Sequence, residues 1–130
     1  MRRRSAAVVI EDGHLLVIGR RKNGREYSVL PGGGVEPGES AREACLRELR
    51  EETGLEGTLV AELDEAGAEQ WPELYFHVHA PRDAPVLTGG PEADVANQHN
   101  VYEPMWVPLA QLGSITLVPD SAIAAVRALL

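Results

Sequence analysis

The sequence predicts a single α+β domain, an α/β/α sandwich built around a mixed β-sheet. Its 130 residues can enclose one hydrophobic core but not two, so residues 1–130 are expected to form one domain. Short β-branched apolar runs recur along the chain, separated by segments rich in Gly, Pro and Asp, which is the pattern of strands and turns. A central segment and a C-terminal segment have helical spacing instead. This order favours helices on both faces of a sheet.

The N-terminal part is expected to consist of strands. Its short apolar or aromatic runs are residues 6–10, 14–18 and 27–30. Asp12-Gly13 stands between the first two runs and is a dipeptide that favours a tight hairpin. Residues 19–25 are basic and contain glycine, so we expect a connection there. Residues 31–34, Pro-Gly-Gly-Gly, are expected to end the strand before them.

A helix is expected over residues 41–53, which contain good helix formers and neither Gly nor Pro. Ser40 and Glu43 have the spacing of a capping box, in which each side chain bonds to the other's main-chain N–H. Gly54 follows the last residue and supplies a C-terminal stop.

The rest of the chain predicts further strands and a closing helix. The expected strands are residues 58–63, 74–79 and 102–107. Residues 89–100 are expected to be a mobile loop. Asp120 or Ser121 can cap a final helix that runs to Leu130 and packs on the sheet. Its apolar residues recur at helical spacing: Ile123, Val126, Leu129 and Leu130.

Charge and composition exclude several classes of protein. A formal net charge of -8 repels phosphate backbones, so we expect no nucleic-acid partner, although a bound dication can reverse the local sign for a small anion. Cys45 is the single cysteine, so no intrachain disulfide can form, and a reducing cytoplasm is expected. The apolar run at residues 6–10 is too short for a signal peptide. Since no stretch approaches about 20 apolar residues, we expect no membrane span.

Three acidic residues of the central helix point to a metal site. Glu48, Glu51 and Glu52 stand at i, i+3 and i+4, which places them within about a third of the helix circumference. A solvated acidic face is the ordinary alternative, but unneutralised like charges at this spacing cost about 0.2–0.5 kcal/mol per pair. Mg²⁺ is a suitable neutraliser, because it prefers oxygen ligands and shares positions with substrate phosphate.

The rest of the helix and the preceding turn fit this hypothesis. Ala41, Ala44 and Cys45 lie on nearly the same stripe as the three glutamates. The opposite side is expected to carry Glu43, Arg47 and Arg50. The glycines of residues 32–34 allow the main chain to approach a ligand closely.

The segment from Gly33 to Leu55 resembles a complete Nudix box. The matching positions are Gly33, five residues, Glu39, seven residues, Arg47-Glu48-Leu49, one residue, Glu51-Glu52, one residue and Gly54-Leu55. Two flanking segments resemble the same family: Leu30-Pro31-Gly32-Gly33 and Trp106-Val107-Pro108-Leu109. A departure is Ser28, where relatives often carry an aromatic residue that Tyr27 could replace.

The resemblance implies a Nudix-type sandwich that uses Mg²⁺, with Mn²⁺ as a substitute, to hydrolyse a diphosphate linkage. Its expected substrate is a small nucleotide-like molecule: a nucleoside diphosphate linked to another moiety. The implied metal ligands are Glu48, Glu51, Glu52 and the Gly32 carbonyl. The expected catalytic residues are Glu52, Glu51, Arg47 and Glu103, with Arg47 and Glu39 as orienting residues. Glu52 is the first candidate for the general base and Glu103 the second.

Substrate contacts are expected from the segment after the first hairpin. Guanidinium groups bind phosphate bidentately, so Arg20 and Arg25 are candidates, together with Tyr27. Family members specific for ADP-ribose or diadenosine polyphosphates often carry a proline or a tyrosine beyond the box; Pro72 and Tyr75 fall near that interval and identify neither subtype. Nudix relatives are frequently dimers, so a homodimer is compatible with the resemblance.

Three other functions remain open at this point. A Nudix-fold nucleotide sensor would be expected to lack box glutamates, which are intact in this chain. An isoprenoid diphosphate isomerase on the same fold would need an additional catalytic cysteine and glutamate. An unrelated acidic helix protein could bind divalent ions without catalysis.

Overall fold

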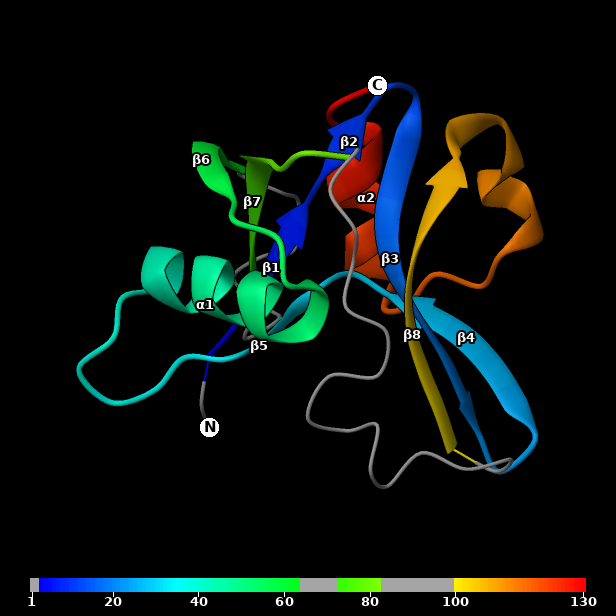
Figure 1. Cartoon of the computed structure of the whole chain (residues 1–130), viewed down its shortest axis with the longest axis horizontal. Helices are drawn as coiled ribbons and strands as arrows, with labels where there is room; N and C mark the ends of the chain where they lie inside the picture. Colours follow the sequence, from blue (N-terminus) through cyan, green and yellow to red (C-terminus); the bar gives the residue numbers. More distant parts are fainter. Residues whose placement is uncertain (1–2, 64–72, 83–99) are drawn as a thin grey trace.

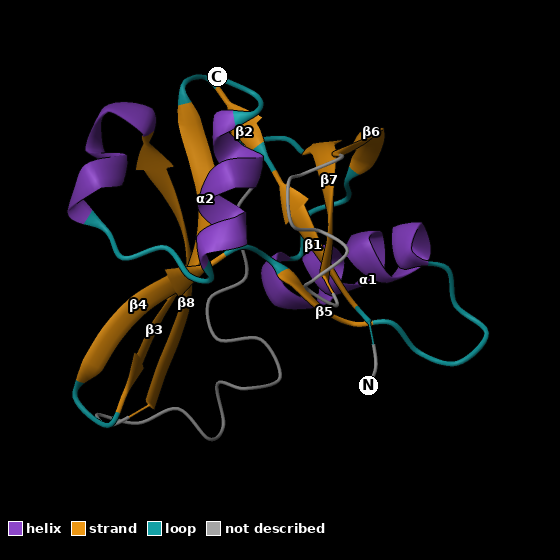
Figure 2. Ribbon diagram, turned by 180° about the vertical axis from the view of Figure 1, so that it is seen from behind, coloured by secondary structure: helices purple, strands orange, loops and turns teal. Residues whose placement is uncertain are grey.

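The computed structural model describes residues 3–63, 73–82 and 100–130. Its described part contains two sheets and two α-helices in three layers. Helix α1 (Ala41–Thr53) lies in front of the sheets in Figure 1, and α2 (Asp120–Arg127) lies in front when the molecule is seen from behind in Figure 2. The helices therefore cover opposite faces, which confirms the predicted α/β/α sandwich.

One sheet is mixed, as predicted. It contains β5 (Gly32–Gly34), β1 (Arg4–Val8), β7 (Glu73–His79) and β6 (Thr58–Leu63) in that order. Strands β1 and β7 run parallel, whereas β5 and β6 pair antiparallel with their neighbours. The second sheet contains β2 (Ile10–Glu11), β3 (His14–Lys22), β4 (Arg25–Val29) and β8 (Asn100–Pro108), all antiparallel.

The predicted hairpin at residues 6–10 and 14–18 is only partly correct. Ile10 and Glu11 pair with β3 around Asp12-Gly13, but β1 leaves the hairpin and joins the mixed sheet. The side chains of β1 explain the difference. Ala6 and Val8 pack on the α2 side and Ala7 on the α1 side, so this strand is buried on both faces and takes partners at both edges.

Of two predictions about breaks in this region, one is wrong and the other is partly correct. Residues 19–25 are not a connection, because β3 continues to Lys22 and β4 begins at Arg25. The turn is Asn23-Gly24, in which both residues have positive φ, as a two-residue hairpin turn requires. Strand β4 ends at Val29, so the predicted break is present, but the glycines of residues 32–34 then form a new strand, β5. A Cβ on Gly32 would lie 2.3 Å from the carbonyl oxygen of Ser5, so glycine permits close approach to β1.

Helix α1 has the predicted bounds and caps. The Ser40 hydroxyl accepts a hydrogen bond from the Glu43 N–H, and the Glu43 carboxylate accepts one from the Ser40 N–H. Gly54 has a left-handed conformation and donates to the Arg50 carbonyl. Strand β6 also has the predicted bounds, while β7 and β8 extend slightly beyond theirs. Residues 89–99 of the predicted loop lie outside the described residues, and Asn100 begins β8.

The C-terminal helix differs from its prediction at both ends. It begins after Pro119, so neither Asp120 nor Ser121 is its cap. The Ser121 hydroxyl instead lies 2.6 Å from the Tyr75 hydroxyl in the core. The helix ends at Arg127, and Leu130 is 67% exposed. A 3₁₀ helix at Leu109–Ser114, which the sequence analysis did not predict, lies between β8 and α2 in the chain.

Two apolar clusters separate the layers. The cluster on the α2 side includes Leu15, Val17, Tyr75 and Val126. The cluster on the α1 side is made of Ala7, Val9, Leu16, Cys45, Leu49, Leu55, Phe76, Val78 and Ala80. Burying both faces of the sheets fixes α1 against β1 and β5. No helix in the described ranges is both long and apolar enough to cross a bilayer.

Candidate metal and active site

The candidate site lies where α1 packs against the glycine strand β5. The buried stripe of α1 runs through Ala44, Cys45 and Leu49, and Glu48 and Glu52 border it. A Cβ on Gly33 would lie 2.5 Å from the carboxyl carbon of Glu48. Glycine at this position therefore lets a carboxylate rest against the main chain of β5.

Burial raises the proton affinity of two of the three glutamates. Desolvation raises the pKa of Glu52 to about 7, against the lowering effects of hydrogen bonds from Tyr102 and Gly32. Burial also raises the pKa of Glu48, although the neighbouring Arg47 opposes this shift. The Glu51 side chain is 50% exposed. Two carboxylates thus lie partly desolvated at one place, where a cation would favour their ionised forms.

Both oxygens of Glu52 accept hydrogen bonds. The Gly32 N–H donates to Oε1 at 2.7 Å, and the Tyr102 hydroxyl donates to Oε2. Tyr102 belongs to β8, where it pairs directly with Arg20 of β3. The Arg20 guanidinium lies over the Tyr102 ring, 4.9 Å from the ring centroid. The site therefore combines α1, β5, β3 and β8.

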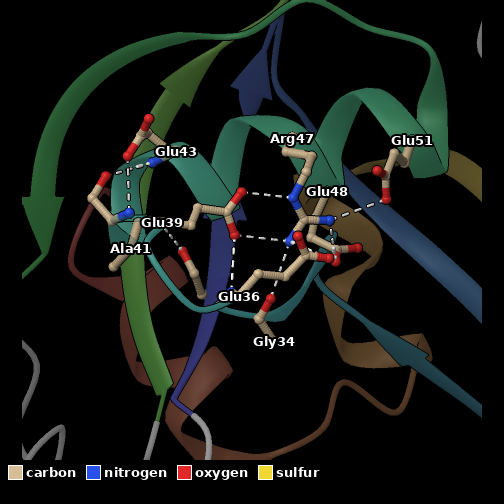
Figure 3. A network of polar contacts seen from close by, with 10 residues as sticks. Gly34, Glu36, Glu39, Ala41, Glu43, Arg47, Glu48 and Glu51 are labelled. Carbon is tan, nitrogen blue, oxygen red and sulfur yellow. Dashed lines mark hydrogen bonds and ion pairs between the residues drawn. The ribbon is translucent and has the colours of Figure 1, made fainter.

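Arg47 joins the remaining acidic residues. Its guanidinium donates to Glu39 through Nε and Nη2, at 2.7 and 3.0 Å. Nη1 donates to Glu48 at 3.0 Å and to Glu51 at 3.2 Å, and Nη2 reaches the Gly34 carbonyl at 3.1 Å. Figure 3 shows the Arg47 side chain lying among these partners. Hydrogen bonds from Arg47 to Glu39 and Glu48 raise the pKa of the guanidinium above its usual range.

The predicted direction of Arg47 is wrong. Its Cα position suggested that the side chain would point away from Glu48 and Glu51, yet the guanidinium contacts both carboxylates. A long side chain can bend across the helix surface towards a cluster of opposite charge. A helical wheel shows only the direction of each Cα atom and therefore does not predict such a bend. Arg47 therefore supplies positive charge between the glutamates.

The donor set fits a hard divalent cation. The carboxylates of Glu48, Glu51 and Glu52 offer oxygen atoms, and Mg²⁺ is typically held by one or two protein carboxylates with water and phosphate in its other positions. Within residues 3–63, 73–82 and 100–130, no three acidic, His or Cys side chains already converge on a common point. Glu48 and Glu51 are instead bridged by Arg47, which bonds to one oxygen of each carboxylate, so the other oxygen of each could bind an ion.

Other predicted site residues lie in two places. Register places Tyr27, Arg20 and Tyr102 in a row across β4, β3 and β8, and the Tyr102 contact with Glu52 puts this row on the α1 face. The Arg25 guanidinium lies 5.3 Å from the centroid of the Tyr27 ring. Glu103 follows Tyr102 on β8 and so points to the opposite face.

Glu103 lines a cavity on that opposite face. The cavity has a volume of about 470 Å³, and its lining includes Arg21, Ser28, Met105 and Thr116, with Arg20 and Tyr27 at its border with the other face. The structure therefore does not bring Glu103 together with the glutamates of α1. Ser28 is buried on this side, where its main chain bonds to residues 116 and 118. Tyr27 is half-buried and also lines this cavity, and its replacement of the aromatic residue stays a prediction.

Sequence reasoning missed the contact between Tyr102 and Glu52. Tyr102 was one of several aromatic residues, and its partner lies 50 positions away in the sequence. The pairing of β3 with β8 would have been needed to find it. Of the two residues considered as substrate markers, Pro72 lies outside the described residues and Tyr75 is buried with its hydroxyl on Ser121.

Fold and site together define a class: a layered α/β/α domain with an acidic helix suited to a divalent cation beside a glycine strand. A family model described as NUDIX domain matches residues 1–128. The chain belongs to the Nudix family, as the sequence motif predicted.

Two curated relatives and one solved structure illustrate the similarity. A CTP pyrophosphohydrolase of Escherichia coli (strain K12) is 38% identical over 77 residues, covering 58% of this chain and 56% of that protein. An ADP-ribose pyrophosphatase of Methanocaldococcus jannaschii is 45% identical over 49 residues, 37% of this chain and 29% of the relative. The solution structure of the E. coli ORF135 protein has a TM-score of 0.64 and 26% identity, covering 99% of this chain and 90% of that one. Alignments with curated relatives span 29% to 56% of their lengths.

Proposed function

We propose that this protein is a magnesium-dependent pyrophosphohydrolase that cleaves a diphosphate linkage in a small nucleotide-like substrate. One observation carries the proposal: Glu52, partly buried and held by Gly32 and Tyr102, lies on the same helix as the Glu48, Glu51 and Arg47 cluster. Such a set of oxygen donors suits a cation that also binds phosphate.

The substrate class is taken from the relatives. Those described above are named for CTP and for ADP-ribose, and both names denote cleavage of a phosphoanhydride bond in a nucleotide. We propose a substrate of this general kind, a nucleoside diphosphate linked to phosphate, a sugar or another group. The negative net charge of the protein favours a small substrate over a nucleic-acid partner.

A bound divalent cation, Mg²⁺ or in its place Mn²⁺, neutralises phosphate oxygens and makes water a better nucleophile. Glu48, Glu51 and Glu52 would hold it, with the Gly32 carbonyl as a further oxygen. Arg47 keeps the acidic cluster in place through its paired hydrogen bonds to Glu39. Arg20 would bind phosphate; its Nε is buried and has no hydrogen-bond partner in the described part of the chain.

We propose Glu52 as the general base. The oxygen of water attacks one phosphorus, the bond from that phosphorus to the bridging oxygen breaks, and the water proton passes to a carboxylate. The Gly32 N–H and the Tyr102 hydroxyl each bind one oxygen of Glu52, so the carboxylate is held in one orientation in which it can accept this proton. Glu103 is the weaker candidate, because it projects from the opposite face of β8.

The competing functions have less support. The box glutamates that a nucleotide sensor would be expected to lose are intact. An isomerase would use a reactive cysteine, but Cys45 is fully buried and burial raises the pKa of its thiol to about 12.

A substrate panel tests the proposal. Nucleoside triphosphates, oxidised nucleotides, ADP-ribose, sugar nucleotides and dinucleoside polyphosphates are incubated with the protein and Mg²⁺, and products are separated by ion-exchange chromatography. We expect at least one substrate to give two phosphate-bearing products. Binding of nucleotides without any cleavage would instead identify a sensor.

A further inference from the structure

Each oxygen of the Glu52 carboxylate accepts a hydrogen bond from a residue outside α1. A carboxylate offers about four lone-pair sites, two on each oxygen. The Gly32 N–H occupies one site on Oε1 and the Tyr102 hydroxyl one on Oε2. The plane of the carboxylate is therefore fixed between β5 and β8, and one lone pair on each oxygen remains for other partners.

The ring of Tyr102 has a second partner. The Arg20 guanidinium stacks over it at 4.9 Å, and the two residues pair across β3 and β8. A cation over an aromatic face is attracted by the ring's electron density, and this contact also limits the rotamers of the long arginine side chain. Tyr102 thus contacts the acidic helix through its hydroxyl and a basic residue through its ring.

We infer that Tyr102 is a positioning residue with two separable roles: its hydroxyl orients Glu52 towards a divalent cation, and its ring holds Arg20 towards the substrate phosphates. This inference rests on the proposed function for its second role. The first role concerns metal binding and can be measured without substrate.

The two roles predict different effects for two substitutions. Tyr102→Phe removes the hydroxyl and keeps the ring, so it should weaken binding of the cation and lower kcat while leaving KM within about twofold. Loss of a hydrogen bond to a metal-binding side chain typically costs 10- to 100-fold in affinity or activity, and we expect about tenfold here. Tyr102→Leu removes both groups and should also raise KM by about three- to fivefold.

The decisive measurement is Mn²⁺ affinity, followed by the electron paramagnetic resonance signal of free Mn²⁺ with no substrate present. Tyr102→Phe should bind Mn²⁺ about tenfold more weakly than the unchanged protein. Tyr75→Phe is the matched control, because it also deletes a hydroxyl that bonds to other side chains, Ser121 and Glu73, but in the core on the α2 side. Its Mn²⁺ affinity should not change.

A double-mutant cycle tests the role of the ring. If the ring acts through Arg20, Tyr102→Leu should raise KM in the unchanged protein but not in an Arg20→Leu background. If Tyr102→Leu raised KM equally in the unchanged protein and in the Arg20→Leu background, the proposed role of the ring would be overturned. Circular dichroism establishes that each variant is folded; if Tyr102→Leu is not, Tyr102→Met replaces it in the same cycle.

Unchanged Mn²⁺ affinity in Tyr102→Phe would overturn the role of the hydroxyl. This outcome differs from failure of the proposed function, in which the unchanged protein would bind Mn²⁺ but cleave no substrate of the panel. The effect of Tyr102→Phe on Mn²⁺ affinity remains informative in that case.

Discussion

Arg47 and Glu39 form a bidentate pair, with Nε 2.7 Å from Oε2 and Nη2 3.0 Å from Oε1. Both side chains are largely buried, at 17% and 15% exposure. The pair fastens the loop before α1 to the middle of the helix, and the third nitrogen of the same guanidinium reaches Glu48 and Glu51. One planar group thus links the loop to the acidic cluster.

Arg47→Lys should reduce both stability and activity, although it keeps the charge. An ammonium group cannot make the two parallel hydrogen bonds to Glu39, so we expect a loss of about 1–2 kcal/mol in the free energy of unfolding. Urea titration provides the measurement, and initial rates should fall about tenfold or more. Arg50→Lys, at an exposed position of the same helix, is the control. Equal free energies of unfolding for the two variants would show that the two parallel hydrogen bonds from Arg47 to Glu39 do not stabilise the fold.

Removal of divalent ions should abolish turnover. With excess EDTA the carboxylates of α1 have no cation with which to activate water, and Mg²⁺ or Mn²⁺ added above the chelator should restore the rate. The rate is followed by product release from whichever panel substrate is cleaved. Full activity in excess chelator would end the proposed mechanism.

In the metal-free protein, stability should fall as pH rises from about 4.5 to above 7. The folded-state pKa of Glu52 is raised from 4.5 to about 7, so between these values the folded protein retains a proton that the unfolded chain has lost. The stabilisation is complete below the unfolded-state value and is lost as pH passes through about 7. Thermal unfolding in EDTA measures this effect, and Glu52→Gln should flatten the slope. Burial also raises the pKa values of Glu48 and Glu73, which contribute to the slope in the same direction.

Substitution of the candidate bases should separate metal binding from proton transfer. Glu52→Gln keeps the shape but removes the charge, and loss of a general base costs about 10²- to 10⁴-fold in rate. Part of the loss should persist at saturating Mg²⁺. Glu103→Gln should retain near-normal kcat, because this residue faces away from α1. Complete rescue of Glu52→Gln by Mg²⁺, with a persistent defect in Glu103→Gln, would assign the base to Glu103.

Cys45 should be inert in the folded protein. Burial raises the pKa of its thiol to about 12, so almost no thiolate is present below pH 10, and iodoacetamide should label it only after unfolding. The stability linked to this thiol is complete below pH 9 and is lost as pH rises towards 12. Cys45→Ser should cost about 1 kcal/mol of stability through a buried hydroxyl and should keep catalysis. Rapid labelling of the native protein would contradict this assignment.

Local sequence signals accounted for α1 and its glutamates but not for the partners of those residues. Ser40, Glu43 and Gly54 act within a few positions of the helix ends, so its bounds could be predicted from neighbouring residues. The division of residues 6–10 between two sheets depends on distant strands and could not be predicted this way. The contact of Tyr102 with Glu52 also depends on a distant strand and could not be predicted from neighbouring residues. The error for Arg47 had another cause: its long side chain was assumed to point in the direction of its Cα position.

The two hydrogen bonds to the Glu52 carboxylate link residues at very different distances along the sequence. Its contact with Gly32 spans 20 positions and the nearby contact of Arg47 with Gly34 spans 13, whereas its contact with Tyr102 spans 50. Shorter loops lose less entropy on closure, so the β5 side of the carboxylate forms at lower cost than the β8 side. Local opening of β8 would break the contact of Tyr102 with Glu52, whereas the contacts of α1 with Gly32 and Gly34 do not depend on β8.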